Sequence, residues 1–284
     1  MSQPDSVIPF EKLPPDFAAT LDDPPDEPAP ARPAATIVLM RDGDAGSDVL
    51  LLRRNRRSGF VPGAYVFPGG RVDEADGAAG LVERVDGLTE DSAAERLEHA
   101  GDHPPAIAFY LAALREAFEE TGILVGNGAD GAHPPTAAES QEVDRIRDEL
   151  MEDRITFAQA LDRMECRVDG SAMEYLAHWI TPTVEPRRYD TRFFAAMVPP
   201  GSDAIIDPRE MTDAVWTTPE VALARNEDGR LPMVFPTIKT LERLARYDDV
   251  ASTLEALAKR RVPSILPRLV TTPTGVGMEL GEEP

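Results

Sequence analysis

The stretch Leu114–Leu124 reads LREAFEETGIL, and the fold of the chain can be predicted outward from it. Its residues fit the second half of a helix that ends at Gly122, because glycine is the commonest residue just past a helix C-terminus. At about 100° per residue, Glu116, Glu119 and Glu120 share one face of this helix. The other face is apolar and is expected to pack on the core through Tyr110, Leu111, Leu114 and Phe118.

The three glutamates form an electrostatically unfavourable cluster. They repel one another, and they lie near the helix C-terminus, where the helix dipole disfavours negative charge. No Lys or Arg stands four residues further along from any of them. A local rule broken this plainly indicates a functional site. A hard divalent cation would relieve the repulsion, since Mg²⁺ is commonly held by a few carboxylates together with substrate phosphates.

Arg115–Ile123 (REAFEETGI) resembles the second half of the Nudix box, G-x5-E-x7-R-E-U-x-E-E-x-G-U with U aliphatic, and matches every fixed position of that half. The first half begins at Gly70 within FPGGRVD, and the position of the first family Glu falls on the shorter Asp76. From Asp76 to Arg115 there are 39 positions where the pattern has 8, so 31 residues are inserted. A box split between 70–76 and 115–123, with an insert at about 77–105, is similar to the coenzyme A diphosphatase branch of the family.

The resemblance implies a fold of the α/β class: the Nudix α/β/α sandwich around a mixed sheet, here with helical insertions and a helical C-terminal section. It also implies Mg²⁺ or Mn²⁺ as cofactor. The expected metal ligands are Glu116 and Glu120, with Glu119 as a further ligand or general base and the Gly70 carbonyl joining them. A carboxylate before the Trp216 strand is expected to complete the site, and Glu210 is preferred over its rivals Asp207 and Asp213.

The resemblance implies a structural role for Arg115. This residue is expected to hold the helix to the preceding loop by pairing with Asp73 or Asp76. The shorter side chain of Asp76 puts that ion pair in question, whereas the metal ligands of the box are intact.

Two arginine-rich segments are candidates for substrate binding. Arg53, Arg54, Arg56 and Arg57 lie just before the FPGG turn. They either balance nearby acids in a solvated loop or bind phosphate, which guanidinium groups contact bidentately. Arg187 and Arg188 lie in WITPTVEPRRYDTRFF, a stretch similar to one in the coenzyme A diphosphatase branch. They are candidates to contact substrate, or they belong to a solvated loop.

Composition limits the partners and the compartment. With 284 residues, 42% hydrophobic, the chain can bury one good-sized core. The 29 basic and 51 acidic residues give a net charge of −22, which argues against nucleic acid or an anionic membrane as partner. The single cysteine, Cys166, fits a reducing compartment. No apolar run approaches the roughly 20 residues of a membrane span, and the expected location is cytoplasmic.

Along the chain, residues 1–33 are expected to form a Pro- and Asp-rich arm, 34–272 the Nudix domain, and 273–284 a disordered tail. Ala35–Met40 and Val49–Leu52 predict an opening hairpin, and Trp179–Val184 and Arg192–Val198 predict further strands. Helices are predicted near residues 92–100, 106–121, 139–151, 156–164, 218–224, 236–244 and 249–260. The pair at 139–164 reads as a helical insertion that packs on the domain, covers the site or contributes to a homodimer.

Three functions remain open from the sequence. The first is a metal-dependent diphosphatase that cleaves coenzyme A or acyl-coenzyme A to 3′,5′-ADP and (acyl)phosphopantetheine. The second keeps this chemistry with another nucleoside diphosphate derivative, such as ADP-ribose or NADH. The third is a Nudix-fold binding module without hydrolysis, which the presence of all three box glutamates disfavours.

Overall fold

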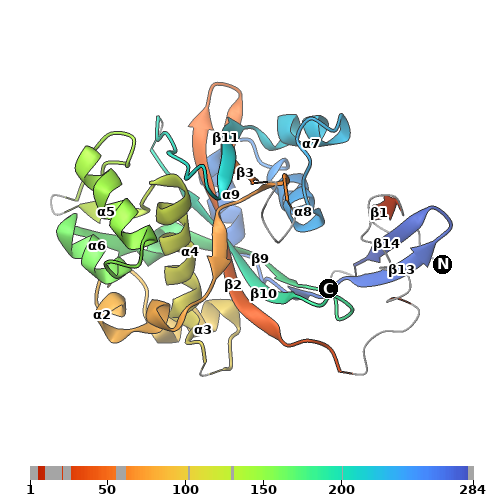
Figure 1. Cartoon of the computed structure of the whole chain (residues 1–284), viewed down its shortest axis with the longest axis horizontal. Helices are drawn as coiled ribbons and strands as arrows, with labels where there is room; N and C mark the ends of the chain where they lie inside the picture. The colour runs from red at the N-terminus through yellow and green to blue at the C-terminus, as the bar shows by residue number, and fades with distance from the viewer. Residues whose placement is uncertain are drawn as a thin grey trace.

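A mixed sheet organises the part of the chain that the structure describes, which in this computed structural model is residues 6–9, 21, 27–55, 62–101, 103–128, 131–199 and 201–280. Within these residues the sheet has eight strands, in the order β11-β3-β2-β10-β9-β12, with β4 paired to β3 and β5 to β2 (Figure 1). The strands are β2 (Ala31–Gly43), β3 (Gly46–Arg54), β4 (Tyr65–Val66), β5 (Gly69–Arg71), β9 (Met173–Ile180), β10 (Arg188–Met197), β11 (Met211–Thr217) and β12 (Ser264–Ile265).

The centre of the sheet is the predicted hairpin of β2 and β3, with β10 parallel to β2. β2 pairs antiparallel with β3 and parallel with β10, and β10 pairs antiparallel with β9. The prediction of a strand at Trp179–Val184 is wrong in its position, because β9 ends at Ile180. Pro182 has no N–H to donate to a ladder, and its carbonyl instead accepts the amide of Glu185 in a turn.

The two faces of the sheet pack against separate groups of helices. Along β2, Ile37 and Leu39 join one apolar cluster, whereas Val38 and Met40 join the other, as the period of two in a strand requires. The first cluster includes α4 (Ala106–Thr121). The second includes residues of α7 (Pro219–Glu227), α8 (Phe235–Leu244) and α9 (Val250–Ala258). The expected α/β/α sandwich with a helical C-terminal section is confirmed.

Two insertions meet beside α4. After η2 (Glu74–Gly77), which carries Asp76 of the box, the insert forms α2 (Ala79–Val82), β6 (Val85–Asp86) and α3 (Glu90–Leu97). The segment after the box forms β7 (Gly126–Gly128), α5 (Gln141–Met151), α6 (Phe157–Arg163), β8 (Cys166–Asp169) and η3 (Gly170–Ala172). A second sheet, of order β6-β8-β7, joins them. In Figure 1 these elements lie together on the left, around α4.

The insert also supports the start of the box helix. Helix α3 begins at Glu90, two residues earlier than predicted, because the Thr89 side chain caps it by accepting the Ser92 amide. The Glu90 carboxylate then accepts the backbone N–H groups of Ala106 and Ile107, at 2.8 and 2.9 Å. These amides at the start of α4 would otherwise lack helical partners. Glu90 therefore satisfies two free amides of the box helix and places a negative charge at the positive end of its dipole.

The chain ends form a third sheet, which differs from the expected arm and tail. β14 (Gly275–Glu279) pairs with β13 (Arg268–Thr272) on one side and with β1 (Ser6–Pro9) on the other. The prediction of disorder after Pro273 is therefore wrong for Gly275–Glu279, and β2 begins at Ala31, inside the expected arm. The partners of β14 include a strand from the opposite end of the sequence, and such a pairing leaves little signal in a local pattern.

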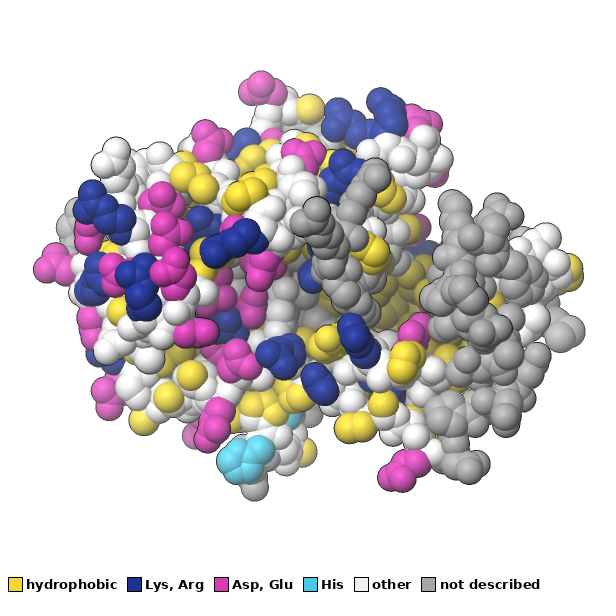
Figure 2. Space-filling model, viewed as in Figure 1, with side chains coloured by type: hydrophobic (Ala, Val, Ile, Leu, Met, Phe, Trp, Pro, Cys, Tyr) yellow, Lys and Arg dark blue, Asp and Glu magenta, His cyan; other side chains and the backbone are white. Residues whose placement is uncertain are grey.

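The surface agrees with the acidic composition. Asp and Glu side chains are spread over the visible face formed by α4, α5 and α6, interspersed with Lys and Arg (Figure 2). Within the described ranges, no helix has both the length and the apolar character needed to cross a membrane.

Candidate active site

The C-terminal end of α4 carries the predicted acidic cluster and is held in place by its flanking residues. Gly122 takes φ 70°, the left-handed conformation, and its N–H bonds the Phe118 carbonyl at 2.8 Å. A Cβ at Gly122 would lie 2.5 Å from the Cβ of Ala137. The carbonyl of Thr121 accepts the amide of Ile205 at 2.9 Å. The helix end is therefore tied to two loops distant in sequence.

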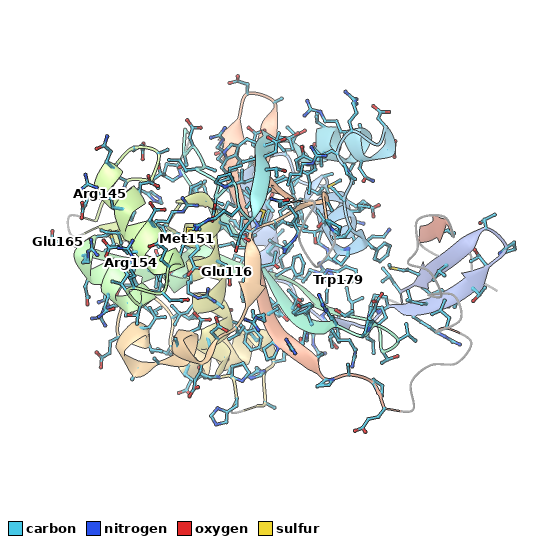
Figure 3. The ribbon with its side chains drawn as sticks, viewed as in Figure 1. Glu116, Arg145, Met151, Arg154, Glu165 and Trp179 are labelled. Atoms are coloured by element: carbon cyan, nitrogen blue, oxygen red, sulfur yellow. The ribbon has the colours of Figure 1, made fainter. Side chains whose placement is uncertain are left out.

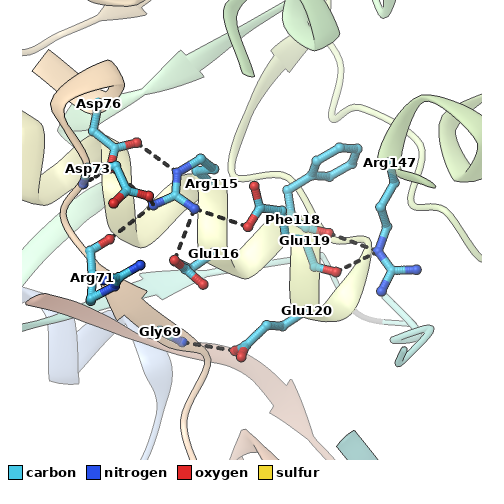
Figure 4. A network of polar contacts seen from close by, with 10 residues as sticks. All are labelled: Gly69, Arg71, Asp73, Asp76, Arg115, Glu116, Phe118, Glu119, Glu120 and Arg147. Carbon is cyan, nitrogen blue, oxygen red and sulfur yellow. Dashed lines mark hydrogen bonds and ion pairs between the residues drawn. The ribbon is translucent and has the colours of Figure 1, made fainter. Parts of the chain in front are cut away.

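Arg115 joins the two halves of the split box (Figure 4). Its Nε donates to Oδ1 of Asp76 at 2.8 Å, and its Nη2 donates to Oδ2 at 3.1 Å. Nη2 also donates to the Arg71 carbonyl at 3.0 Å. Asp73 is the more distant of the two predicted partners, at 3.7 Å. Asp76 is 1% exposed, so the principal ion pair is buried.

The same guanidinium also contacts the acidic cluster. Nη1 of Arg115 donates to Oε1 of Glu116 and to Oε2 of Glu119, each at 3.0 Å. Burial lowers the pKa of Arg115, but Asp76, Glu116 and Glu119 outweigh burial and raise the pKa overall. Arg115 therefore stays charged and neutralises part of the cluster.

Glu120 and Glu116 lie against the paired glycines of β5. Oε2 of Glu120 accepts the Gly69 amide at 3.0 Å (Figure 4). A Cβ on Gly69 would come within 2.4 Å of the Ala35 carbonyl oxygen, and a Cβ on Gly70 within 2.3 Å of Glu116 Oε1. Glycine at position 69 lets β5 approach β2, and glycine at position 70 lets the turn approach the Glu116 carboxylate. The Gly70 backbone thus lies where the resemblance places it, beside the carboxylates.

The carboxylates of the cluster carry more negative charge than their surroundings neutralise. Burial, together with the charges of Glu116 and Asp76, raises the pKa of Glu119 to about 7 against the opposing effect of Arg115. Burial likewise raises the pKa of Glu116, and burial together with Glu116 raises that of Glu120. An all-oxygen donor set with excess negative charge fits Mg²⁺ or Mn²⁺.

The carboxylates of the cluster do not converge on a single position where an ion could bind. Among the described residues, no three His, Cys, Asp or Glu side chains are grouped so that they could hold an ion. The polar contacts account for this, since Arg115 draws Glu116 and Glu119 to one side and Gly69 holds Glu120. The donors are present in one place, and their carboxylates would turn towards an ion that replaces these contacts.

A cleft of about 290 Å³ opens next to the cluster. Figure 3 shows two of its lining side chains, Glu116 from α4 and Met151 from the end of α5. The full lining is Glu116, Glu119, Glu120, Met151, Asp207, Arg209, Glu210 and Met211. Glu210 lies here as predicted, and its charge contributes to the raised pKa of Glu120. Its rival Asp213 is not part of this lining and accepts the Tyr65 hydroxyl at 2.6 Å.

A tight turn built on Asp207 supplies one wall of the cleft. The Asp207 carboxylate accepts the Arg209 amide at 2.9 Å, an Asx-type contact, and its carbonyl accepts the amides of Glu210 and Met211 at 3.1 and 2.8 Å. Asp207 also bonds Arg209 Nε, at 2.8 and 3.0 Å to its two oxygens. Sequence reasoning weighed Asp207 only as a ligand and missed Arg209.

Arg147 of α5 is a second residue that the sequence did not reveal. It is 3% exposed, and its Nε donates to the carbonyls of Phe118 and Glu119, at 3.2 and 2.8 Å (Figure 4). Both carbonyls belong to the last turn of α4, where carbonyl groups run out of helical partners, although that of Phe118 also accepts the Gly122 N–H. The negative end of the helix dipole also stabilises a buried cation at this position. Arg147 thus joins the insertion helix to the residues of the box.

The predicted substrate arginines lie in three settings. Arg53 and Arg54 are at the end of β3, and the charge of Arg54 lowers the pKa of Glu120, which puts it near the cluster. Arg56 and Arg57 fall outside the described residues. Arg187 is exposed, and Arg188 donates to the carbonyls of Thr181 and Ala29, at 3.0 and 2.7 Å. Neither of these last two lines the cleft.

Comparison with known proteins identifies the family. The model of the NUDT19 Nudix domain matches residues 29–244. Proteins named acyl-coenzyme A diphosphatase NUDT19 are similar, from *Xenopus laevis* at 28% identity over 72% of this chain and from *Homo sapiens* at 26% over 89%. The match spans 61% of the *Xenopus* protein and 72% of the human one.

A solved structure agrees with this match. The NUDIX hydrolase of *Alicyclobacillus acidocaldarius* superposes with a TM-score of 0.67 and 26% identity, covering 82% of this chain and 99% of that one. The resemblance carried by the box is therefore confirmed at the level of both sequence and fold. The chain belongs to the Nudix hydrolase family, in the group defined by the NUDT19 Nudix domain.

Proposed function

We propose that this protein hydrolyses the diphosphate linkage of coenzyme A or acyl-coenzyme A, giving 3′,5′-ADP and (acyl)phosphopantetheine. The observation that carries the proposal is the acidic cluster of α4, which lines a cleft and retains all three box glutamates. The substrate comes from the relatives, which are named acyl-coenzyme A diphosphatases. The split box agrees with that branch of the family.

Glu116, Glu120 and Glu210, with the Gly70 carbonyl, would hold Mg²⁺ or Mn²⁺. Bound at this site, the ion supplies Lewis acidity to phosphate oxygens and lowers the pKa of a water. Glu119 lines the same cleft one helical position from Glu120, and its side chain is 19% exposed. It is suited to serve as a further ligand or to take the proton of the attacking water. Arg115 would hold the box helix to the first half of the box through its ion pair with Asp76.

The remaining assignments extend this proposal to the substrate and its setting. Arg54, whose charge acts on Glu120, is the preferred candidate to contact a phosphate, and Arg53, Arg56, Arg57, Arg187 and Arg188 stay candidates for the rest of the substrate. The partner is a small-molecule diphosphate rather than nucleic acid, in keeping with the net charge of −22. A cytoplasmic location and a homodimer stay predictions, the first resting on the lone free cysteine, Cys166.

A hydrolysis screen tests the proposal. Coenzyme A, acetyl-coenzyme A, ADP-ribose and NADH are compared with Mg²⁺ and with Mn²⁺, using Glu120→Gln as the blank. Faster turnover of the two coenzyme A species supports the proposal. Faster turnover of ADP-ribose or NADH keeps the chemistry and overturns the substrate, and hydrolysis of none of the four favours a binding module.

A further inference from the structure

We propose that Arg209 is a substrate-binding residue, whose guanidinium receives a phosphate group of the substrate inside the cleft. This inference rests on the proposed diphosphatase function and adds to it a residue outside the Nudix box. Part of the phosphate binding is thereby assigned to the loop before β11 (Met211–Thr217), in addition to the arginines near β3.

The charges of the cleft make a cation necessary. Its ionisable lining residues are five acids and one base: Glu116, Glu119, Glu120, Asp207, Glu210 and Arg209. A diphosphate entering this cleft meets carboxylates at close range, and a divalent ion at the cluster can neutralise only the oxygens that it contacts. Among the described lining residues, Arg209 alone can offer N–H donors and positive charge to the other oxygens.

The Asp207 turn holds Arg209 ready for such a contact. Both the backbone N–H and Nε of Arg209 bond the Asp207 carboxylate, which is itself only 10% exposed. This ion pair uses the Nε side of the planar guanidinium and leaves its two terminal NH₂ groups outside the pair. The Arg209 side chain is nevertheless 67% exposed. A fixed Nε with exposed NH₂ groups is a preorganised phosphate donor, because less side-chain entropy is lost on binding.

The neighbour of Arg209 in the chain strengthens the assignment. Arg209 and Glu210 are consecutive residues of one turn, and both line the cleft together with Glu120. The turn therefore presents a carboxylate for the ion and a guanidinium for the phosphate at one wall of the cleft. A metal-bound diphosphate needs both kinds of contact at adjacent positions.

The alternative role of Arg209 is that of a plain counterion for Asp207, and a matched variant separates the two. Arg230 also pairs with an aspartate two residues earlier, Asp228, through Nη2 rather than Nε, and its side chain is 66% exposed, but it does not line the cleft. Arg209→Gln is expected to raise KM for coenzyme A about tenfold, the scale of one lost charge-assisted hydrogen bond, with kcat changed less. The same variant should weaken inhibition by 3′,5′-ADP, and Arg230→Gln should alter neither constant.

Two substrates distinguish which phosphate Arg209 contacts. If it contacts the diphosphate, Arg209→Gln raises KM for coenzyme A and for 3′-dephospho-coenzyme A by the same factor. If it contacts the 3′-phosphate, the effect disappears with 3′-dephospho-coenzyme A. Unchanged KM and inhibition constants in an active Arg209→Gln enzyme overturn the inference and leave the proposed function intact.

A binding measurement keeps the inference testable without turnover. Calorimetric titration of the wild-type protein, Arg209→Gln and Arg230→Gln with inorganic pyrophosphate and Mg²⁺ is expected to show about tenfold weaker binding for Arg209→Gln alone. Equal affinities for all three proteins would refute the assignment. A wild-type protein that binds pyrophosphate but hydrolyses no substrate would instead count against the proposed function.

Discussion

Arg115 and Asp76 form a two-point ion pair across 39 residues of sequence, with Nε 2.8 Å from Oδ1 and Nη2 3.1 Å from Oδ2. Asp76 occupies the position of the family Glu with one methylene fewer. The short helix η2 compensates, because Asp76 lies inside it and also accepts the Asp73 amide at 2.8 Å. The insert that splits the box thus leaves its internal ion pair intact.

Replacing Asp76 should therefore be costly. Asp76→Ala leaves a largely buried guanidinium without its main partner, and we expect a loss of about 3 kcal/mol in the free energy of unfolding. Urea denaturation measures this. The control is Asp73→Ala, since Asp73 lies 3.7 Å from Arg115 with its side chain 56% exposed, and it should cost under about 1 kcal/mol. Equal losses for the two variants would show that the buried ion pair with Asp76 contributes no more to stability than the exposed contact with Asp73.

Glu120→Gln should separate activity from stability. It removes a proposed ligand charge, so most turnover should be lost. In a chelator the variant should unfold at the same or a higher temperature than the wild type, because burial and Glu116 disfavour the charged form of Glu120. Glu165→Gln serves as control, since Glu165 lies at the outer edge of the molecule (Figure 3). Full activity in Glu120→Gln would refute its role as a ligand.

The metal-free protein should gain stability from Glu119 as the pH falls. The pKa of Glu119 in the folded protein is about 7, above the ordinary value of 4.5, so the folded state binds the proton more tightly than the unfolded state. The charged carboxylate is destabilising at pH 8, and this penalty is removed as the pH falls through about 7. Thermal unfolding in chelator should thus show Glu119→Gln more stable than wild type at pH 8, with the difference shrinking by pH 6. A constant difference would contradict the raised pKa.

Arg147 should support the box helix, α4, from outside the box. Arg147→Gln removes the charged donor to the Phe118 and Glu119 carbonyls, and we expect a loss of about 2 kcal/mol in stability and a lower affinity for Mg²⁺ in the hydrolysis assay. Arg147→Lys keeps the charge and should recover part of both.

The matched control for Arg147 is on the same helix. Arg145 has a 68% exposed side chain and lies at the outer surface of α5 (Figure 3). Arg145→Gln should leave the Mg²⁺ dependence unchanged. If Arg147→Gln lowers stability without altering the Mg²⁺ dependence, the residue packs the insertion and does not position the glutamates.

The arginine segment before the FPGG turn makes its own prediction. Replacing Arg56 and Arg57 together by Gln should raise KM for coenzyme A more than KM for ADP-ribose, because only coenzyme A carries the additional 3′-phosphate. Steady-state kinetics with both substrates measures the difference. Equal changes in the two KM values would argue that these arginines balance nearby acids and do not bind the substrate.

The site residues that could be predicted from the sequence were those marked by a pattern among neighbouring residues. Glu116, Glu119 and Glu120 could be placed on one face because a helix repeats every 3.6 residues, and Glu210 was proposed through the resemblance to the Nudix family, as a carboxylate before the Trp216 strand. Arg147 could not be found in this way. It lies among acids on a helix with an amphipathic pattern, and its burial depends on carbonyls 28 and 29 residues away. Arg209 escaped notice for a similar reason, since only the folded turn shows that it faces the cleft.

The same distinction holds for the fold. The β2–β3 hairpin and the helices α4, α8 and α9 follow from nearby residues. The helices were predicted close to their observed limits, whereas both hairpin strands extend beyond the predicted ranges. Strand β14 was missed because half of its pairing is to Ser6–Pro9, at the other end of the chain. Pairings over such distances are set by tertiary context, which a propensity scale does not contain.

The small sheet of β6, β8 and β7 has a consequence for how this protein can be shortened. β8, which belongs to the segment after the box, pairs with β6 from the insert in the box and with β7 from its own segment. Deleting either insertion alone would expose a strand edge and apolar residues that the other now covers. The two insertions therefore behave as a single accessory unit, and a minimal version of the enzyme has to lose or keep both together.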